Sequence, residues 1–309
     1  MKLTMRPYRD EDDYWRVRNF LRDVFLVNGR REFSWQVHRF DGCRWHTWEN
    51  MGRYKIEDAL YLWETDDGRL GAALNPEGRN GVFLHVHPDF RTPELEEEMM
   101  ALAEERFPVS LPGRPTRVIV FADSNDAMRK SVLESRGYAL DDGVEYQRRR
   151  SMDLSIEDAP VADGYEVRAL GGPDELPARS WVSWRAFHPD APEAEYEGWE
   201  WYRNIQRCPL YRRDLDIVAV APGGKELAAF CTVWFDDVTR TGAFEPLGAA
   251  PEHQRKGLAR AVMTEGLRRL KRLGATQAHI GSFEPRTHAL NESLGFVEYD
   301  LCEPWKKEM

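Results

Sequence analysis

The sequence predicts an α/β chain made of two tandem domains of the same kind, each a central mixed β-sheet flanked by helices. Three observations carry this prediction. Strand-like and helix-like segments alternate after an antiparallel meander, which is typical of a mixed sheet. The two halves of the chain share landmarks in the same order. Between them lies a polar stretch with Pro and Gly, 148–164, of the kind that joins domains.

The shared landmarks indicate an internal duplication. Two copies of one structural unit should keep a nearly constant sequence offset. The matched pairs are Arg6 with Arg168, Pro88 with Pro251 and Gly137 with Gly295, at offsets of 162, 163 and 158 positions. We therefore expect a first domain over residues 1–152 and a second over residues 153–309.

The second half shows the expected elements most clearly. Periodicity and turn residues predict them in order: a strand at 165–170, helices at 175–187 and 194–206, and hairpin strands at 215–222 and 225–237. A strand at 242–250, a helix from Leu258, a strand at 277–283, a helix at 286–295 and a strand at 296–301 follow. In the helix from Leu258, apolar and small residues recur at spacing four through Val262, Gly266 and Leu270, and Gly274 ends the pattern.

Composition excludes several classes of protein. A net charge of −10 argues against a protein that binds nucleic acid by neutralising phosphates. Because no apolar run approaches the roughly 18 residues of a membrane span, we expect no membrane association. The four cysteines are far apart in the sequence, which favours reduced thiols and a cytoplasmic location. The "HVH" and "CRWH" segments lack the further ligands of a zinc site, so no metal is expected.

Positive charge is nevertheless concentrated in one place. Between Pro251 and Arg272 there are seven basic residues against Glu252 and Glu265. The segment "QRKGLA", from Gln254 to Ala259, connects a strand to a helix there. A first helical turn offers unpaired backbone N–H groups and the positive end of the helix dipole, and a glycine lets a ligand approach the backbone closely. These features predict a pyrophosphate cradle.

The spacing Gln-x-x-Gly-x-Ala in this context resembles the acyl-coenzyme A loop of the GNAT (GCN5-related) N-acetyltransferase superfamily. The downstream "ALNESLGF" is similar to a later helix of that family, which usually ends Leu-Tyr-x-x-x-Gly-Phe. The resemblance covers the second half well and the first half weakly. It implies two tandem GNAT-like domains, acetyl-CoA as co-substrate, and direct acetyl transfer to the amine of a small-molecule acceptor.

The resemblance also implies roles for individual residues. The strand that ends at Ala249 would separate from its neighbour, with Leu247, Gly248 and Ala249 offering backbone groups to the pantetheine arm and the thioester. Gln254 would belong to the loop. The backbone N–H groups that would hold the pyrophosphate are those of Arg255, Lys256, Gly257, Leu258, Ala259 and Arg260.

An amine acceptor must lose a proton before it attacks the thioester. Glu245 matches the glutamate that does this in many members of the family, and a partly buried Glu paired with an Arg is the structural alternative. The family's tyrosine, which protonates the leaving thiolate, is replaced by Asn291. Asn291 could still donate a hydrogen bond to sulfur, or Ser282 or Tyr299 could substitute, so the general acid stays open.

The first half departs further from the family pattern. Gly257 corresponds to Glu94 and Ala259 to Glu96, in the segment "FRTPELEEEMM". Thr92 can cap this helix, Pro93 suits its first position, and the glutamates satisfy the dipole internally. We expect a degenerate first domain that does not bind acyl-CoA.

Three questions stay open from the sequence alone. The aromatic residues around Trp181, Trp184 and His188 could wall an acceptor site, although membership of the core is the favoured interpretation; the nearby glutamates are expected to form a solvated face. The whole chain could be a catalytically silent acyl-CoA-binding or interaction module instead of an enzyme, since the usual acid is missing. Exposed sheet edges could pair two copies into a homodimer.

Overall fold

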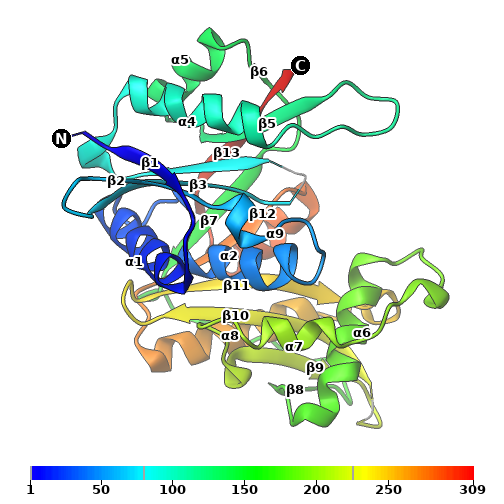
Figure 1. Cartoon of the computed structure of the whole chain (residues 1–309). Coiled ribbons are helices and arrows are strands. Elements are labelled where there is room, and N and C mark those ends of the chain that lie inside the picture. The colour runs from blue at the N-terminus through cyan, green and yellow to red at the C-terminus, as the bar shows by residue number, and fades with distance from the viewer. Residues whose placement is uncertain (1, 79–80, 225) are drawn as a thin grey trace. The chain divides into compact units, whose positions relative to one another are not determined.

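The computed structural model describes residues 2–78, 81–224 and 226–309, and the chain divides into two compact units. Unit 1 comprises residues 1–147 and 300–309, and unit 2 comprises residues 148–299. Both contain a mixed β-sheet with helices, as predicted (Figure 1). Within the described ranges no helix is both long and apolar enough to cross a membrane.

Unit 1 orders its strands β1-β2-β3-β4-β5-β13. Its strands are β1 (Thr4–Pro7), β2 (Tyr61–Glu64), β3 (Leu70–Pro76), β4 (Val82–Val86), β5 (Arg117–Asp123) and β6 (Ala139–Leu140), and β7 (Glu145–Ser151) begins in this unit. Its helices are α1 (Glu11–Val27), α2 (Val37–Gly42) with a π-helical continuation (Cys43–Trp48), α3 (Ile56–Ala59), α4 (Pro93–Arg106) and α5 (Ala127–Ser135). Two apolar clusters, one around Trp63 and Met99 and one around Tyr14 and Phe40, form its core.

The last strand of the chain, β13 (Glu298–Glu308), pairs with β5 of unit 1. The antiparallel register runs from Cys302 opposite Asp123 to Glu308 opposite Arg117. The predicted division at residue 152 places residues 300–309 in the second domain, whereas the observed unit 1 includes them. Offset and linker composition carry no information on which sheet a terminal strand joins, so only the pairing reveals it.

Unit 2 orders its strands β12-β11-β10-β9-β8. The strands are β8 (Glu166–Ala169), β9 (Asp216–Val220), β10 (Leu227–Asp236), β11 (Thr241–Ala249) and β12 (Gln277–Ser282); the helices are α6 (Leu176–Phe187), α7 (Trp201–Ile205), α8 (Leu258–Leu273) and α9 (Pro285–Ser293). Short 3₁₀ turns lie at Pro173–Glu175, Glu193–Glu195, Arg213–Leu215 and Pro251–His253, as one does at Pro88–Phe90 in unit 1. The core of unit 2 joins the sheet to α8 through side chains such as Phe244, Val262 and Leu267.

Glycines bring α8 close to its sheet. A Cβ added at Gly266 of α8 would lie 2.6 Å from Cε1 of Phe244, and one added at Gly242 of β11 would overlap the Leu270 side chain. Because these positions carry no side chain, the helix packs directly on β11. The strand end at Ala249 and the helix start at Leu258 are thereby held near each other, which positions the loop between them.

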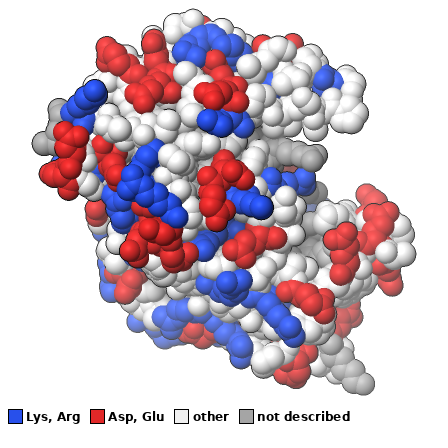
Figure 2. Space-filling view, viewed as in Figure 1, with Lys and Arg blue, Asp and Glu red and all other residues white. Residues whose placement is uncertain are grey.

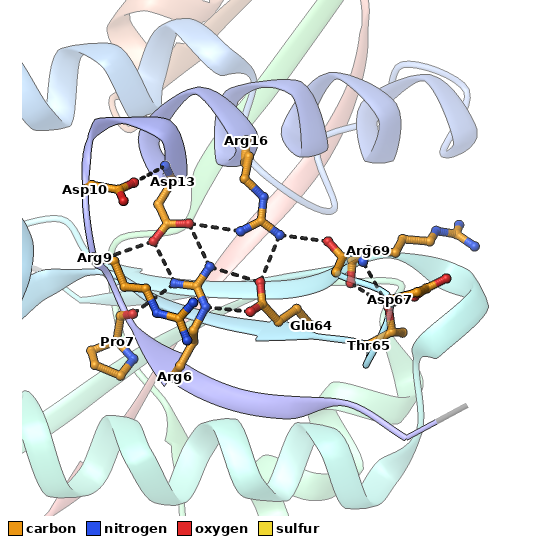
Figure 3. Close-up of polar contacts among 11 residues, drawn as sticks. Arg6, Pro7, Arg9, Asp10, Asp13, Arg16, Glu64, Thr65, Asp67 and Arg69 are labelled. Atoms are coloured by element: carbon orange, nitrogen blue, oxygen red, sulfur yellow. Dashed lines mark hydrogen bonds and ion pairs between the residues drawn. The ribbon is translucent and has the colours of Figure 1, made fainter.

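A matching hydrogen-bond network supports the predicted duplication. In unit 1, Arg6 binds Asp13 through two hydrogen bonds of 2.6 and 2.7 Å, and Asp13 also accepts from the backbone N–H of Arg9 (Figure 3). In unit 2, Arg168 binds Glu175 in the same two-pronged way, and Glu175 accepts from the N–H of Gly171. Each member of the second set follows its counterpart by 162 positions. The same local device therefore fixes the first strand to the first helix in both units.

Candidate acyl-CoA site

Strand β11 carries a β-bulge where the candidate base lies. Cys231 of β10 is opposite Leu247 and Val233 is opposite Phe244, so one residue of β10 faces the two residues Glu245 and Pro246. Such a bulge bends a strand and turns side chains away from the regular alternation. The parallel register with β12 spans Thr241–Ala243. Among the described pairings none joins β11 to β12 beyond Ala243, although β11 continues to Ala249 and β12 to Ser282.

The Glu245 side chain is exposed, whereas the residues after it in β11 are half-buried. The carbonyl of Glu245 accepts a hydrogen bond from the indole N–H of Trp234, which holds the bulged backbone. Of the structural alternative, a partly buried glutamate paired with an Arg, only the burial is at odds with this exposure. The geometry therefore places a carboxylate in solvent at the point where the register between the two strands ends.

Gly248 has a packing role. A Cβ at this position would lie 2.7 Å from Cζ of Phe230 and 2.9 Å from the Cβ of Ala186 in α6. The side chains of Leu247 and Ala249 pack against the core that α8 covers, while Gly248 faces α6. The segment from Leu247 to Ala249 is thus fixed between two helices, and its strand backbone is rigidly placed.

The loop after β11 has the backbone geometry of an anion cradle. Gly257 is the N-cap of α8 in the left-handed region, with φ +75°, and Arg255 also has a positive φ of +64°. Gln254 donates to the carbonyl of Ala249 at 3.3 Å, which ties the loop to the strand end. Leu258 is buried, whereas residues 254–257 are exposed.

The backbone N–H groups of the cradle are available to a ligand. Within the part of the chain that the structure describes, those of residues 255–260 have no intramolecular hydrogen-bond partner, and the first turn of α8 contains no acidic residue and no side-chain cap. Unpaired N–H groups at a helix start bind anions because the helix dipole adds partial positive charge there.

The cations of the cradle differ from those of the rest of α8. Arg268 pairs with Asp158, and Arg269 lies 2.7 Å from Glu265. In contrast, among the described residues no carboxylate pairs with Arg255, Lys256 or Arg260. Arg260 donates to Ser293 Oγ at 3.2 Å, and Lys256 contacts Tyr165 and a backbone carbonyl. Three arginines farther along this helix, Arg268, Arg269 and Arg272, thus lie beside carboxylates, whereas the cations at its start have no carboxylate partner among the described residues.

The candidates for the general acid differ in exposure. Asn291 of α9 is 1% exposed, and neither its amide oxygen nor its amide nitrogen has a partner within the described residues. Ser282, at the end of β12, is also buried, and its hydroxyl has no partner there. Tyr299 is exposed and lies under the Arg148 guanidinium. Buried polar groups are nearly always hydrogen-bonded, and of the three candidates Asn291 and Ser282 depart from this rule.

The aromatic residues of α6 do not belong to the core, which corrects the favoured interpretation. Trp181 and Trp184 are half-buried and stacked with ring centroids 5.4 Å apart, and His188 stacks on Trp184 at 5.5 Å. Their positions lie opposite the face of α6 that carries the buried Arg179, Val182 and Ser183. The helical spacing in the sequence shows that the rings share a face, but not that this face points outward.

The acidic residues between α6 and α7 are exposed, as expected. Figure 2 shows acidic side chains on the projecting lobe formed by this segment. The glutamates of this group are Glu193, Glu195, Glu197 and Glu200. They form a solvated negative face beside the aromatic stack.

A buried network that the sequence analysis missed anchors α6. Arg179, which is fully buried, binds Asp216 at 2.8 Å and Thr232 at 2.9 Å, and Tyr202 of α7 donates to Asp216. Burial raises the pKa of Tyr202 well above its ordinary value. Thr232 is the β10 residue that faces the β11 bulge. The partners are far apart in the sequence, so no local signal connects them.

The corresponding helix start in unit 1 is already filled. The Thr92 hydroxyl caps the N–H of Leu95, and Glu96, fully buried, lies 2.8 Å from Arg91 and 2.9 Å from Arg129. Burial acts to raise the pKa of Glu96, but the two guanidinium groups hold it below its ordinary value. The negative charge at the start of α4 is therefore provided by the protein itself. No group of three potential metal ligands occurs among the residues that the structure describes.

Comparison with known proteins finds a family match over part of the chain. Residues 177–296 match the model of the acetyltransferase (GNAT) family. No curated protein matches the sequence. A solved GCN5-related N-acetyltransferase from Sphaerobacter thermophilus aligns with a TM-score of 0.68 and 16% identity over 99% of this chain and 95% of that chain.

Two further solved structures show the same fold over the whole chain. A tandem GNAT protein from the clavulanic acid biosynthesis pathway aligns with a TM-score of 0.68 and 15% identity, covering 99% of this chain and 98% of that one. A GNAT-family acetyltransferase from Colwellia psychrerythraea gives a TM-score of 0.61 and 12% identity over 99% of this chain and 100% of that one. The fold is therefore that of a tandem GNAT protein.

Proposed function

Because the second unit carries a GNAT acetyltransferase domain at residues 177–296, we propose that this protein is an N-acetyltransferase. It transfers the acetyl group of acetyl-CoA to the amine of a small-molecule acceptor by direct attack. Family membership supports acyl transfer in general. The cradle carries the rest of the proposal, because it combines unpartnered N–H groups at residues 255–260 with cations that no described carboxylate neutralises.

In this proposal each residue of the site has a defined task. The N–H groups from Arg255 to Arg260 bind the pyrophosphate, and the backbone from Leu247 to Ala249 aligns the pantetheine arm. The end of the described β11–β12 pairing supports an insertion of that arm between the two strands. Glu245 takes the proton from the acceptor ammonium, directly or through water, before the nitrogen attacks the thioester carbon.

The leaving thiolate needs little assistance, because a free thiol has a pKa of about 8.5. We propose the Asn291 amide as a hydrogen-bond donor to the sulfur, since its burial without a described partner would otherwise destabilise the fold. Ser282 is the second candidate on the same ground, and the exposure of Tyr299 speaks against it.

The test of this function measures the turnover of acetyl-CoA with each member of a panel of small amines. The readout is the release of free thiol. We expect turnover with at least one amine, and a single equivalent of acetyl-CoA bound per chain in calorimetry. Binding without turnover across a broad panel would favour the silent acyl-CoA-binding module instead. Two equivalents per chain would refute the assignment of a degenerate first domain.

A second test addresses the base. Glu245→Gln should lower kcat by roughly 10²- to 10⁴-fold, the usual contribution of a general base, and should remove the corresponding limb of the pH profile of kcat/KM. Glu166→Gln, at an exposed position of β8 outside the site, serves as the matched control. If Glu245→Gln leaves the pH profile unchanged, Glu245 is not the base.

A further inference from the structure

Lys256 is the cation of the cradle whose position is held by defined contacts. Its ammonium group donates to the hydroxyl of Tyr165 at 2.8 Å and to the carbonyl of Glu252 at 3.1 Å. Tyr165 directly precedes β8 and is distant from Lys256 in the sequence. By comparison, Arg255 is exposed and has no described partner, and Arg260 contacts only the Ser293 hydroxyl among the described residues. Among the described residues Lys256 is thus held by two hydrogen bonds, Arg260 by one and Arg255 by none.

Tyr165 is itself held by a second side chain. Its hydroxyl lies 2.8 Å from Nδ1 of His253, and the two rings meet edge to face. An ammonium group can only donate hydrogen bonds. The hydroxyl oxygen of Tyr165 therefore accepts from Lys256, and its own hydrogen is free to point toward Nδ1 of His253, which connects Lys256 to Tyr165 and Tyr165 to His253.

The far side of His253 faces a carboxylate. Nε2 of His253 lies 3.2 Å from Glu226, a contact at ion-pair distance without hydrogen-bond alignment. His253 ends the 3₁₀ turn that precedes the cradle, and Glu226 directly precedes β10. The imidazole therefore lies between Tyr165 and the residue that precedes β10. Lys256 is thereby connected through the Tyr165 and His253 rings to the start of β10.

This arrangement has a consequence for ligand binding. An exposed lysine loses up to about 2 kcal/mol of side-chain entropy when it is ordered. Two of the three ammonium hydrogens of Lys256 are already engaged within the protein, so this ordering precedes the ligand. One hydrogen is left for a phosphate oxygen. Preorganisation of this kind raises affinity without adding a contact.

We propose that Tyr165 and His253 are positioning residues that fix Lys256 for the phosphates of coenzyme A. The inference rests on the proposed function and deepens it, because it assigns affinity for the phosphate groups to side chains outside the cradle loop. Neither Tyr165 nor His253 touches the reacting atoms in this proposal. They act on the binding of acyl-CoA and not on the chemical step.

The test measures the Kd of coenzyme A by calorimetry on the full-length protein, with 3′-dephospho-coenzyme A as a second probe. Tyr165→Phe and Lys256→Met should each weaken coenzyme A binding by about five- to tenfold, the size expected for the loss of one ordinary hydrogen bond. The double variant should be no weaker than Lys256→Met alone, because coupled residues are not additive. Acetyl-CoA KM should rise with little change in kcat.

Further variants separate positioning from folding. His253→Asn retains an acceptor near the place of Nδ1 and should keep binding near the wild-type value, whereas His253→Ala should resemble Tyr165→Phe. Arg268→Met removes a neutralised cation of the same helix and should have no effect on binding. If Lys256 contacts the 3′-phosphate, Lys256→Met should not change the Kd of 3′-dephospho-coenzyme A. If Lys256 contacts the pyrophosphate, Lys256→Met should weaken the binding of both probes.

The outcomes distinguish this inference from the proposed function. If the wild-type protein binds no coenzyme A, the proposed function fails, and this inference fails with it. If the wild type binds but Tyr165→Phe binds equally well or more tightly, only the positioning network is refuted. Additive effects of Tyr165→Phe and Lys256→Met would also refute it, since they would show independent contributions.

Discussion

Substitution of the cradle glycine, Gly257→Ala, separates backbone strain from ligand binding. Gly257 has φ +75°, and an added Cβ would meet nothing closer than a carbonyl oxygen at 3.8 Å. The substitution therefore lowers the free energy of unfolding only through the unfavourable backbone conformation, by about 1–2 kcal/mol for a residue with a Cβ in the left-handed region. The added methyl group would stand on the exposed side of the cradle, where the ligand has to approach the backbone.

The effect on binding should be larger than the effect on folding. If the methyl group displaces one charge-assisted hydrogen bond between an N–H group and a phosphate, about 1.5–3 kcal/mol is lost, which raises Kd roughly 10- to 150-fold. Gly224 offers a matched control, because it has φ +74° in the same unit and nothing lies within 4 Å of an added Cβ.

The assay compares both variants by urea denaturation and by calorimetry with acetyl-CoA. Gly257→Ala and Gly224→Ala should lose similar unfolding free energy, and only Gly257→Ala should lose affinity. If the two variants bind acetyl-CoA equally well, the loop at Gly257 does not hold the phosphates, and the reasoning from the cradle is wrong.

Three further predictions concern buried groups. Asn291→Leu removes two buried polar atoms that have no described partner. It should leave the unfolding free energy unchanged or raise it by about 1–2 kcal/mol, and it should lower kcat. A loss of stability with normal turnover would contradict the proposed role. Burial, with Arg129 and Arg39 nearby, lowers the pKa of His85 to about 3. Below about pH 6.5 the unfolded chain therefore binds a proton at His85 that the folded unit 1 does not bind. The free energy of unfolding should fall by about 1.4 kcal/mol per pH unit from about pH 6.5 toward pH 3. Between pH 7.5 and pH 5, denaturation should show a smaller loss of unfolding free energy for His85→Gln than for the wild type. Glu96→Gln leaves buried guanidinium groups uncompensated and should cost about 3–5 kcal/mol without creating a second acetyl-CoA equivalent; calorimetry detecting one would overturn the view that this helix start is closed.

The local features of the site could be predicted from sequence. Gln254 to Ala259 lie on one continuous strand–loop–helix segment, so the order of residue types already places the glycine at the helix start. Leu258 and Val262 recur at helical spacing and bury the face that fixes this start. The duplication could be predicted for the same reason, because Arg6 and Arg168 form their networks with partners seven positions away.

Other features depend on contacts between distant segments. The bulge at Glu245 exists only against β10, and the stacked rings of Trp181 and Trp184 face outward because the opposite side of α6 packs on the sheet. Tyr165 meets Lys256 across 91 positions. Composition and periodicity describe one segment at a time and cannot specify such pairs.

The sequence by itself determined that the chain repeats one α/β unit and that only the second copy has a glycine and a cluster of basic residues at the helix start. The tertiary structure decided which sheet the last strand joins, which cations stay free of carboxylates, and which polar atoms are buried without a partner. The physical reason is that backbone conformation and charge at a helix start are local properties. Strand pairing, charge compensation and burial depend on residues that approach one another only when the chain has folded.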